Sequence, residues 1–580
     1  RSTVSINATP QSLNTVLVNS DQRISDLQLL TPSMIANIHQ RNVTAVAWPA
    51  HTLAQQFYTH VLEQPDHTAL IDDVTGQEWS YGQLHHLATH IATHLNTMFN
   101  DPRQMIVMLH IEPLAQLVIA ILAVQYAGMI YYCIDHSAPE ERKAVMKGVV
   151  QPDLFYLCVE PNAPQARLEQ LLEDVAPALV LTASVVNCAV PQTTRCVHYS
   201  QLPEASPISK FQGYHSTPQA CACLFYTSGT TGKPKAVAVS HQGIIHMAWQ
   251  PDYVTILPGQ GVGSVSTPAF DAFSFDFWAA LTNGAYTVML TPDMLCYRGN
   301  DNDLKPAATV NVLFITTALF HSLISGSAPL LASISYLLVG GEALRPKAVR
   351  QFYRRFMPNP PQLIQVYGPT ECSTFATAWP VPQNFIGDRL PIGQGIGQTQ
   401  CWVLTPEGEL VSEDESGELY LSGPGLALGY YADEQTTCQK FVDCHFTSTP
   451  VCCYRTGDKV RWNNQGQLEW LARIDSQVKV RGFRVDLNEL EQHILSAPDV
   501  EAAVVLTREN EVSIELVAFV SGSADQLIDF LKSRVPGWML PHEVHRLPAL
   551  PLTQNGKIDR QQQALSFDTL RAWLDHQRNL

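Results

Sequence analysis

Nine consecutive residues, Thr227–Lys235 (TSGTTGKPK), combine glycines, hydroxyl side chains and lysines in a pattern that suits phosphate binding. Glycines let the backbone turn several N–H groups toward one point, and hydroxyl groups and lysines add further donors. Segments 224–226 and 236–239 read as strands, so the loop should join two strands. The loop is not of the Walker A type, which requires glycine at Thr227 and a hydroxyl residue at Pro234. We therefore predict a phosphate loop of another class, with a surface hairpin as the alternative.

Five further short motifs follow this loop along the chain. They are Gly340–Glu342 (GGE), Val366–Glu371 (VYGPTE), Tyr454–Asp458 (YRTGD), Ala472–Asp475 (ARID) and Asn555–Arg560 (NGKIDR). Their order and content resemble the adenylate-forming superfamily, which includes acyl-CoA synthetases, luciferases and nonribosomal peptide synthetase adenylation domains. The resemblance extends over about residues 50–560, and the loop is the phosphate-binding signature of that family. One departure is Ala236, where the family usually has glycine.

The resemblance implies a site for ATP and Mg²⁺. The implied phosphate-binding residues are Thr227, Ser228, Gly229, Thr230, Thr231, Gly232 and Lys235. Tyr367 would cover the adenine, and Thr370 would bond a phosphate oxygen. Glu371 would hold Mg²⁺, a hard cation that takes oxygen ligands. The other implied nucleotide-binding residues are Gly341, Glu342, Asp458 (the ribose clamp) and Arg473.

Two residues are implied to serve the two halves of the reaction. Lys557 matches the catalytic lysine of the family and would neutralise the charge that builds between the substrate carboxylate and the phosphate. The alternative for Lys557 is an ordinary solvated lysine in a turn. The C-terminal part would then rotate about Asp475 as a hinge, withdraw Lys557 and admit the phosphopantetheine thiol supplied by a carrier protein.

Three segments favour the peptide synthetase branch of the family. Residues 21–32 resemble the linker between a condensation domain and an adenylation domain, and Arg481–Glu491 resembles the motif after the hinge in that branch. Phe270–Trp278 has the pattern of its substrate-pocket segment. We therefore expect activation of an α-amino acid for nonribosomal peptide synthesis. A free-standing acyl-CoA or aryl-CoA ligase and a non-catalytic docking domain of a megasynthetase are the alternatives.

The resemblance also implies which residues bind the substrate. In the peptide synthetase branch, the position of Asp271 pairs with the substrate ammonium in a charge-assisted bond, and a helix-capping role is the alternative. The remaining pocket residues implied are Ala272, Phe275, Phe314, Leu338, Gly340, Val366, Phe375 and Ala376. Because such a lining would leave a charged substrate side chain unpaired, we expect an aliphatic amino acid, with Val or Ile ahead of Leu. One methylene discriminates only about 10- to 200-fold, so the choice among these stays open.

The composition limits the partners. The chain has 580 residues and a net charge of −17, which argues against a nucleic-acid groove. The long uncharged run Leu114–Ile134 contains two glutamines and a glycine, so a buried helix followed by a buried strand is expected rather than a membrane span. A cytoplasmic protein is predicted. The expected partners are the amino acid, a peptidyl carrier protein and a neighbouring condensation domain, with an MbtH-like protein as a further candidate.

These residues need a scaffold that brings distant segments together. Apolar strand-like runs alternate with helical patterns from about residue 50 to 440, which predicts α/β layers with parallel strands. Asp486 opens a helix in a compact tail. The predicted fold is α/β: a large N-terminal subdomain of layered sheets with a small β-barrel-like piece, plus a small mobile α+β C-terminal subdomain. The predicted boundaries are 1–45 for an interdomain linker, 46–474 for the adenylation core and 475–580 for the lid.

Overall fold

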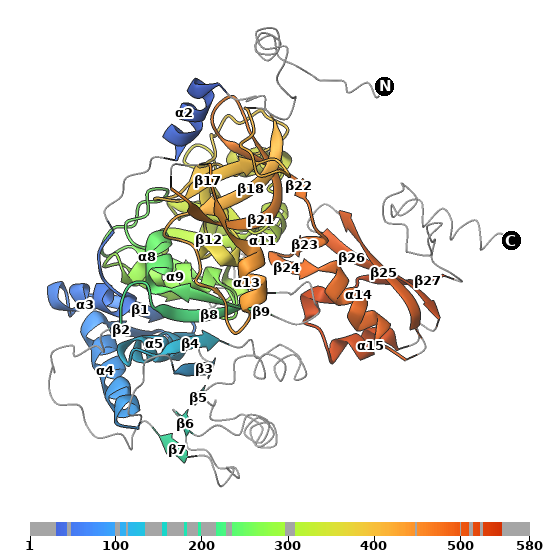
Figure 1. Cartoon of the computed structure of the whole chain (residues 1–580). Coiled ribbons are helices and arrows are strands. Elements are labelled where there is room, and N and C mark those ends of the chain that lie inside the picture. The colour runs from blue at the N-terminus through green and yellow to red at the C-terminus, as the bar shows by residue number, and fades with distance from the viewer. Residues whose placement is uncertain are drawn as a thin grey trace, which may run out of the picture.

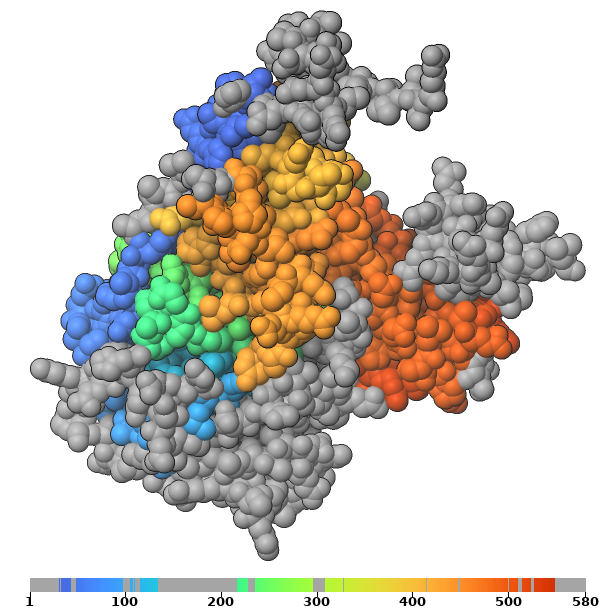
Figure 2. All heavy atoms as spheres, viewed as in Figure 1, coloured from blue at the N-terminus to red at the C-terminus, as the bar shows by residue number. Residues whose placement is uncertain are grey.

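The computed structural model describes residues 31–42, 48–98, 105–111, 114–133, 154–158, 179–182, 195–198, 216–227, 235–295, 308–326, 328–413, 415–446, 449–498, 500–509, 514–522 and 526–547. They form two large mixed sheets with helices between and around them, a third antiparallel sheet and a smaller C-terminal α+β unit (Figure 1). In the space-filling view the C-terminal unit lies against the surface of the third sheet (Figure 2).

The eight-stranded sheet holds the two ends of the predicted phosphate loop. In spatial order its strands are β19 (Gly429–Tyr430), β9 (Lys235–Ser240), β8 (Cys221–Thr227), β4 (Ile130–Cys133), β3 (Ile106–Ile111), β5 (Leu154–Cys158), β6 (Leu179–Thr182) and β7 (Arg195–His198). Strands β3 to β8 pair in parallel, and β9 returns antiparallel to β8. Thr227 and Lys235 are paired at the ends of β8 and β9, as expected for a loop between two strands.

The nine-stranded sheet ends at the predicted nucleotide motifs. In spatial order its strands are β16 (Gln394–Gly395), β15 (Thr377–Pro380), β14 (Gln362–Tyr367), β13 (Tyr336–Gly340), β12 (Val312–Thr316), β10 (Gly261–Ser264), β11 (Tyr286–Met289), β1 (Thr68–Asp72) and β2 (Gln77–Ser80). The central strands from β14 to β1 are parallel. Gly340 and Tyr367 are the last residues of β13 and β14. They therefore lie at the carboxyl edge, where open α/β sheets usually bind ligands.

Two apolar helices pack between these sheets. They are α5 (Leu114–Tyr126) and α9 (Ala272–Leu281), and every residue of α9 is buried. Trp278 of α9 donates its Nε1 proton to the Tyr131 hydroxyl of β4 at 3.5 Å, while the helix also contacts β10 and β11 of the other sheet. The predicted buried helix and strand within Leu114–Ile134 are confirmed as α5 and β4. Within the described ranges, none of the helices combines the length and apolar character needed to cross a membrane.

The outer helices cover the remaining faces, and most of them follow a hydroxyl residue or start with a proline. They are α3 (Leu53–Glu63), α4 (Tyr81–Met98), α8 (His241–Ala248), α10 (Pro292–Leu295), α11 (Thr317–Ser325), α12 (Pro346–Phe356) and α13 (Glu434–Lys440), with short 3-10 turns η4 (Pro329–Ala332) and η5 (Thr370–Cys372). The start of α3 shows the local chemistry: Thr52 accepts from the Gln55 backbone, and the Gln55 side chain accepts from the Thr52 backbone. This reciprocal pair satisfies two N–H groups that a helix start leaves unpaired.

The third sheet is antiparallel and carries the ribose-clamp motif. Its strands are β17 (Gln400–Leu404), β18 (Ser416–Ser422), β21 (Val451–Trp462), β20 (Phe441–Cys444) and β22 (Leu468–Arg473). The register of β21 and β22 places Asp458 opposite Arg473. Helix α2 (Pro32–Arg41), which falls in the predicted linker, packs on this sheet. Just after α2, the Asn42 side chain bonds both the N–H and the carbonyl of Cys401, so the helix is fixed to β17.

The C-terminal unit has a hydrophobic core of its own. It contains β23 (Gln477–Val480), β24 (Phe483–Asp486), α14 (Leu487–Leu495), β25 (Val500–Glu509), β26 (Ile514–Gly522), α15 (Leu527–Lys532), η6 (Gly537–Met539) and β27 (Glu543–Arg546). Asp486 caps α14 by accepting from the Asn488 N–H at 2.9 Å, as the sequence predicts. Leu490 of α14 packs with Val520 of β26 in a cluster separate from the other cores. A separate core allows such a unit to behave as a subdomain.

Candidate functional site

The site lies where the ends of β13 and β14 meet the third sheet and the β23–β24 hairpin. Gly340 pairs with Val366 across β13 and β14. The next residue, Gly341, has φ +97°, and a Cβ placed there would lie 3.1 Å from the Cα of Gly482 in the hairpin. Gly482 also donates its N–H to Glu342 Oε1 at 2.7 Å. The hairpin therefore contacts the core backbone directly at the predicted nucleotide motif.

Asp458, the predicted ribose clamp, is buried and contacts three side-chain donors. Its Oδ2 accepts from the Tyr367 hydroxyl at 2.6 Å and pairs with Arg473 at 3.0 Å, while its Oδ1 accepts from Trp470 Nε1 at 2.8 Å. Burial, followed by the neighbouring Asp458 charge, raises the pKa of Tyr367 well above its ordinary value, so this hydroxyl remains a donor. The three donors fix the orientation of a carboxylate that could accept from ribose hydroxyls.

Arg473 connects the ribose clamp to the predicted hinge. Its guanidinium makes a two-pronged contact with Asp475, at 2.9 Å from Nε and 2.6 Å from NH2. It also donates to the Thr456 carbonyl and to Gln477 Oε1. Although burial raises the pKa of Asp475, the Arg473 guanidinium outweighs it and the pKa lies below its ordinary value. The Asp475 carboxylate is therefore ionised and held by the same arginine that pairs with Asp458.

Glu371, the predicted magnesium ligand, is 1 % exposed. Its Oε1 accepts from the Tyr430 hydroxyl at 2.6 Å, and NH1 of Arg484 lies 3.1 Å from Oε1 and 3.0 Å from Oε2. Burial raises the pKa of Glu371, but Arg484 and Tyr430 together bring it below its ordinary value. A buried ionised carboxylate of this kind is a chemically suitable ligand for Mg²⁺.

One lysine and one arginine of the hairpin reach the site with their side chains. Neither is among the site residues that the family resemblance implies. Lys479 and Arg484 are register partners in β23 and β24. Lys479 Nζ lies 5.5 Å from the centre of the Tyr367 ring, and burial lowers the pKa of this lysine. The signal in the sequence is the pair of cations that a two-stranded hairpin places side by side.

The predicted substrate residues gather around the N-terminus of α9. Ala272, Phe275, Phe314, Leu338, Val366 and Phe375 belong to one buried cluster. The Phe375 ring centre lies 5.3 Å from that of Phe275 and 5.2 Å from that of Phe314. The structure separates Ala376 from this group and packs it with the core of the third sheet. Phe375 and Ala376 thus fall in different buried clusters, and the assignment of Ala376 to the pocket remains a prediction.

Asp271 lies at the start of α9 and is 6 % exposed. Among the residues that the structure describes, its side chain makes no capping hydrogen bond to the helix, which removes support for the capping alternative. Burial raises the pKa of Asp271, and the Thr370 hydroxyl and Lys479 partly oppose this. Thr374 donates its hydroxyl proton to the Asp271 carbonyl at 3.1 Å from a left-handed conformation (φ +76°). Sequence reasoning missed Thr374, whose unusual conformation has no sequence signature.

The phosphate loop meets the magnesium candidate through Lys235. Its Nζ lies 5.5 Å from the ring centre of Tyr430, the tyrosine that bonds Glu371. Thr227 ends the opposite strand and is buried. Ser228, Gly229, Thr230, Thr231 and Gly232 lie outside the described residues, as does Lys557. The described ends of the loop are thus placed on the same side of the site as Glu371.

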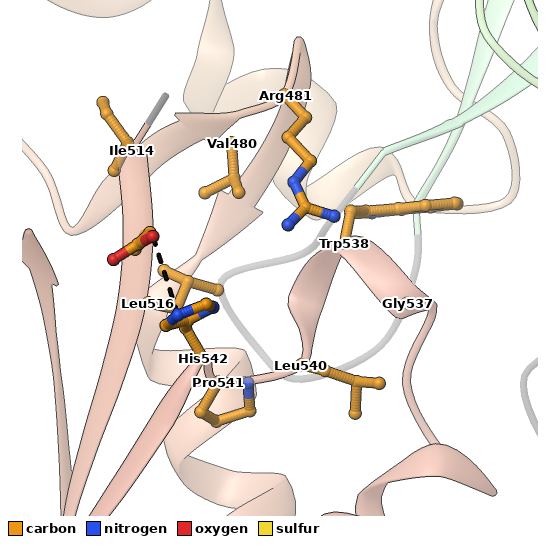
Figure 3. A pocket seen from close by; sticks show the side chains of 10 residues that line it. Val480, Arg481, Ile514, Leu516, Gly537, Trp538, Leu540, Pro541 and His542 are labelled. Atoms are coloured by element: carbon orange, nitrogen blue, oxygen red, sulfur yellow. Dashed lines mark ion pairs between the residues drawn. The ribbon is translucent and has the colours of Figure 1, made fainter. Parts of the chain in front are cut away.

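A separate cavity of about 240 Å³ lies in the C-terminal unit. Its lining includes Arg481, Trp538 and His542, and His542 Nε2 lies 3.7 Å from Glu515 Oε1 (Figure 3). Trp538 stacks on Phe483 of the hairpin with ring centres 4.0 Å apart. None of the predicted nucleotide or substrate residues within the described ranges lines this cavity.

Comparison with known proteins agrees with this geometry. Residues 57–431 match the family model of AMP-binding enzymes, and residues 489–557 match that of the AMP-binding enzyme C-terminal domain. The chain belongs to the AMP-binding enzyme family. Malpibaldin synthetase of Mortierella alpina is 31% identical over 559 residues, covering 94% of this chain and 10% of that protein. Surfactin synthase subunit 3 of Bacillus subtilis (strain 168) is 32% identical over 564 residues, covering 95% of this chain and 41% of that protein. The chain thus spans a small part of the first relative and under half of the second.

Solved structures give the same assignment. The adenylation and PCP-domain protein PA1221, an NRPS protein in its holo form, has a TM-score of 0.74 and 28% identity, covering 88% of this chain and 83% of that one. The fused adenylation–PCP protein NpsA-ThdA from Klebsiella oxytoca has a TM-score of 0.73 at 20% identity, covering 92% and 98%, and supports the fold. The predicted fold class, the relation to nonribosomal peptide synthetase adenylation domains and the enzyme class, an adenylating ligase, are confirmed.

The Tyr367 hydroxyl offers a test of the clamp. We predict that Tyr367→Phe, which removes the 2.6 Å bond to Asp458, raises the KM for ATP because Asp458 loses a positioning donor. Losing a hydrogen bond to a buried charged group should also lower the free energy of unfolding by about 1–3 kcal/mol.

The matched control is Tyr353→Phe, since the Tyr353 hydroxyl also donates a 2.6 Å bond, but to the Val381 carbonyl. Thermal unfolding and steady-state kinetics should show a stability loss in both variants and a change in KM in Tyr367→Phe alone. Equal KM values for ATP in the two variants would contradict the clamp.

Proposed function

We propose that this chain activates an aliphatic α-amino acid with ATP, releasing pyrophosphate, and transfers the aminoacyl group to the phosphopantetheine thiol of a carrier protein. The observation that carries the proposal is Asp271, a buried carboxylate beside a buried apolar cluster and in hydrogen-bond contact with Thr370 of the nucleotide motif. An ammonium group is the natural partner for such a carboxylate, and an acid without an amine would leave it unpaired.

In the first half-reaction, an oxygen of the substrate carboxylate attacks the α-phosphorus of ATP while the bond from that phosphorus to pyrophosphate breaks. Positioning dominates such phosphoryl chemistry. Asp458 would hold the ribose, the loop ending at Lys235 would hold the phosphates, and Asp271 would hold the ammonium. Mg²⁺, when bound at Glu371, would supply charge neutralisation at the leaving pyrophosphate.

The pocket lining supports a short, uncharged substrate side chain. The ring centre of Phe375 lies 5.3 Å from that of Phe275 and 5.2 Å from that of Phe314, and Ala272 belongs to the same buried cluster. None of the predicted pocket residues other than Asp271 carries a charge. We therefore keep Val and Ile ahead of Leu.

A panel of amino acids in ATP–pyrophosphate exchange tests this choice. We expect the highest rates with Val or Ile, with Leu within the roughly 10- to 200-fold discrimination that one methylene permits. Phe375→Ala should shift the preference toward larger apolar side chains because it removes one ring of the lining. Phe352→Ala, a truncation in a different core cluster, is the control and should leave the order unchanged. A wild-type preference for Lys, Glu or Asn would reject the proposal.

Asp271→Asn separates an amino-acid enzyme from an acyl-CoA ligase. The amide keeps the shape but loses the charge, so kcat/KM for valine should fall by at least about tenfold, as expected for a lost charge-assisted bond. The rate with 3-methylbutanoic acid, which has no amine, should change little. Asp276→Asn is the control, since Asp276 is buried in the same helix but bonds Ser264 and Ser266. An equal fall with both substrates would contradict the assigned role.

Substitution of Lys557 tests whether this residue serves only the first half-reaction. Lys557→Ala should abolish aminoacyl-adenylate formation, because the charge on the reacting oxygens loses its partner. Transfer from preformed aminoacyl-adenylate to a carrier protein should be largely retained. Free CoA in place of the carrier protein tests the ligase alternative in the same assay. Equal loss of both half-reactions would contradict this role. A neighbouring condensation domain and an MbtH-like protein remain predictions.

A further inference from the structure

Two free cysteines share one face of the third sheet. Cys444 ends β20 and Cys453 lies in β21, and the register pairs Cys444 with Val451 and Val442 with Cys453. The two cysteines are therefore diagonal neighbours on the same side of an antiparallel pair. Their thiols are joined by a hydrogen bond, and the Cys453 thiol also donates to the Val451 carbonyl at 3.5 Å. The two sulfur atoms are thus in contact, although a loop separates the two residues in the chain.

The surroundings of the two thiols differ. Cys453 is fully buried, while Cys444 is 8 % exposed at the end of its strand. The hydrogen bond from Cys453 holds the pKa of Cys444 below its ordinary value, whereas the same bond, together with burial, raises the pKa of Cys453. Oxidants attack cysteines of lowered pKa, and a neighbouring thiol then resolves the product. Cys444 is therefore the reactive member of the pair and Cys453 the resolving one.

The pair lies between the third sheet and α2. Cys444 and Cys453 pack with Ile38 of α2 in one buried cluster. Because side chains alternate along a strand, the next residue of β21, Tyr454, points to the opposite face, where it packs in the cluster that contains Tyr367. The two thiols and the nucleotide motif are therefore separated by one layer of sheet.

A series of ring contacts leads from these two strands to Glu371. Phe441 of β20 is the register partner of Tyr454 in β21, and their ring centres lie 5.2 Å apart. The Phe441 ring centre lies 6.0 Å from that of Tyr430, whose hydroxyl bonds Glu371 at 2.6 Å. The distance between β20 and β21 therefore influences how Tyr430 is held against Glu371.

A disulfide between the two cysteines would change that distance. Diagonal Cα atoms of an antiparallel pair usually lie about 7–8 Å apart, whereas a disulfide spans about 4.4–6.8 Å between Cα atoms. Closing the bond would therefore draw β20 and β21 together at Cys444 and Cys453. Close-packed interiors transmit such a displacement, so Phe441 and Tyr454 would move with their strands.

We propose that Cys444 and Cys453 form a redox modification site. A peroxide converts the two thiols into a disulfide that joins β20 to β21, and the activity of the neighbouring site falls. The Cys444 sulfur attacks one oxygen of hydrogen peroxide, the O–O bond breaks, and the leaving hydroxide takes the Cys444 proton, which gives a sulfenic acid and water. The Cys453 sulfur then attacks the Cys444 sulfur, and the hydroxyl group leaves with the Cys453 proton as a second water. Two thiols and one peroxide thus give one disulfide and two waters.

Mass spectrometry of the full chain without reduction tests the bond. After treatment with hydrogen peroxide, chymotryptic cleavage at Phe446 separates Cys444 from Cys453. The disulfide should then appear as one linked species, two hydrogen atoms lighter than the sum of its two peptides, and dithiothreitol should release it. Oxidation of Cys444 to a sulfinic or sulfonic acid instead, or a disulfide between Cys452 and Cys453, would overturn the proposal.

Serine variants separate the pair from its neighbour in the chain. Cys444→Ser and Cys453→Ser should both abolish the linked species, and Cys444→Ala gives a second variant at the less buried position. Cys452→Ser is the matched control, because Cys452 is exposed and pairs with Asp443 on the opposite face, so this variant should link as the wild type does. A link that persists in Cys444→Ser, or that disappears in Cys452→Ser, would reject the assigned pair.

Pyrophosphate exchange with valine on the same preparations measures the effect on activity, and this readout alone rests on the proposed function. Oxidation should lower the wild-type rate by up to about 100-fold, the loss that a displacement of about 1 Å within a site can cause, and dithiothreitol should restore it. Cys444→Ser should keep its rate in peroxide. A linked wild type with an unchanged rate would reject the effect on activity. If the reduced protein exchanges with no amino acid, the proposed function fails, and the mass measurement still decides the disulfide.

Discussion

Three carboxylates with almost no access to water constrain the centre of this protein. Glu371, Asp458 and Asp271 are 1 %, 5 % and 6 % exposed. An ionised carboxylate in such surroundings is tolerated only with hydrogen bonds and a positive partner. Arg484 serves Glu371 and Arg473 serves Asp458, while Lys479 lies near enough to oppose the effect of burial on Asp271. The strands that supply these cations, β22 to β24, follow the three carboxylates in the chain. Their placement therefore depends on the charges of those carboxylates.

Helix α9 explains why the Asp271 carboxylate is held firmly in place. Helix α9 lies between two sheets, and its first turn begins at Asp271. Its Trp278 bonds Tyr131 of one sheet, and its Asp276 accepts from Ser264 of the other. Interiors packed on all sides transmit small displacements instead of absorbing them. A substrate group bound at Asp271 therefore meets a helix that has little freedom to adjust.

The sequence predicts most of the scaffold and the core motifs, because both depend on local patterns. Leu114–Ile134 is uncharged and mostly apolar, and its helix and strand follow from that and from Gly128. Tyr367 and Gly340 end parallel strands, as their motifs require. The partners of Asp458 are different: Trp470 and Tyr367 reach it from strands whose pairing is set by tertiary packing. Arg484 and Lys479 depend on where a whole subdomain rests, which no local pattern encodes. Phe375 and Ala376 are neighbours in the sequence but fall in different buried clusters, which adjacency in the sequence does not reveal.

The contact between Gly341 and Gly482 has a consequence for how the position of the β23–β24 hairpin against the core can be altered. Both residues have positive φ angles, +97° and +87°, and a Cβ on Gly341 would meet bare backbone at 3.1 Å. The contact between the two glycine backbones thus limits how close the hairpin lies to the core. The attraction between the hairpin and the core comes instead from charged side chains a few residues away. A single methyl group at either glycine would act as a wedge, holding the two bodies apart without touching any charged group. Depth of insertion and strength of insertion are therefore separate properties, each open to change by a different single substitution.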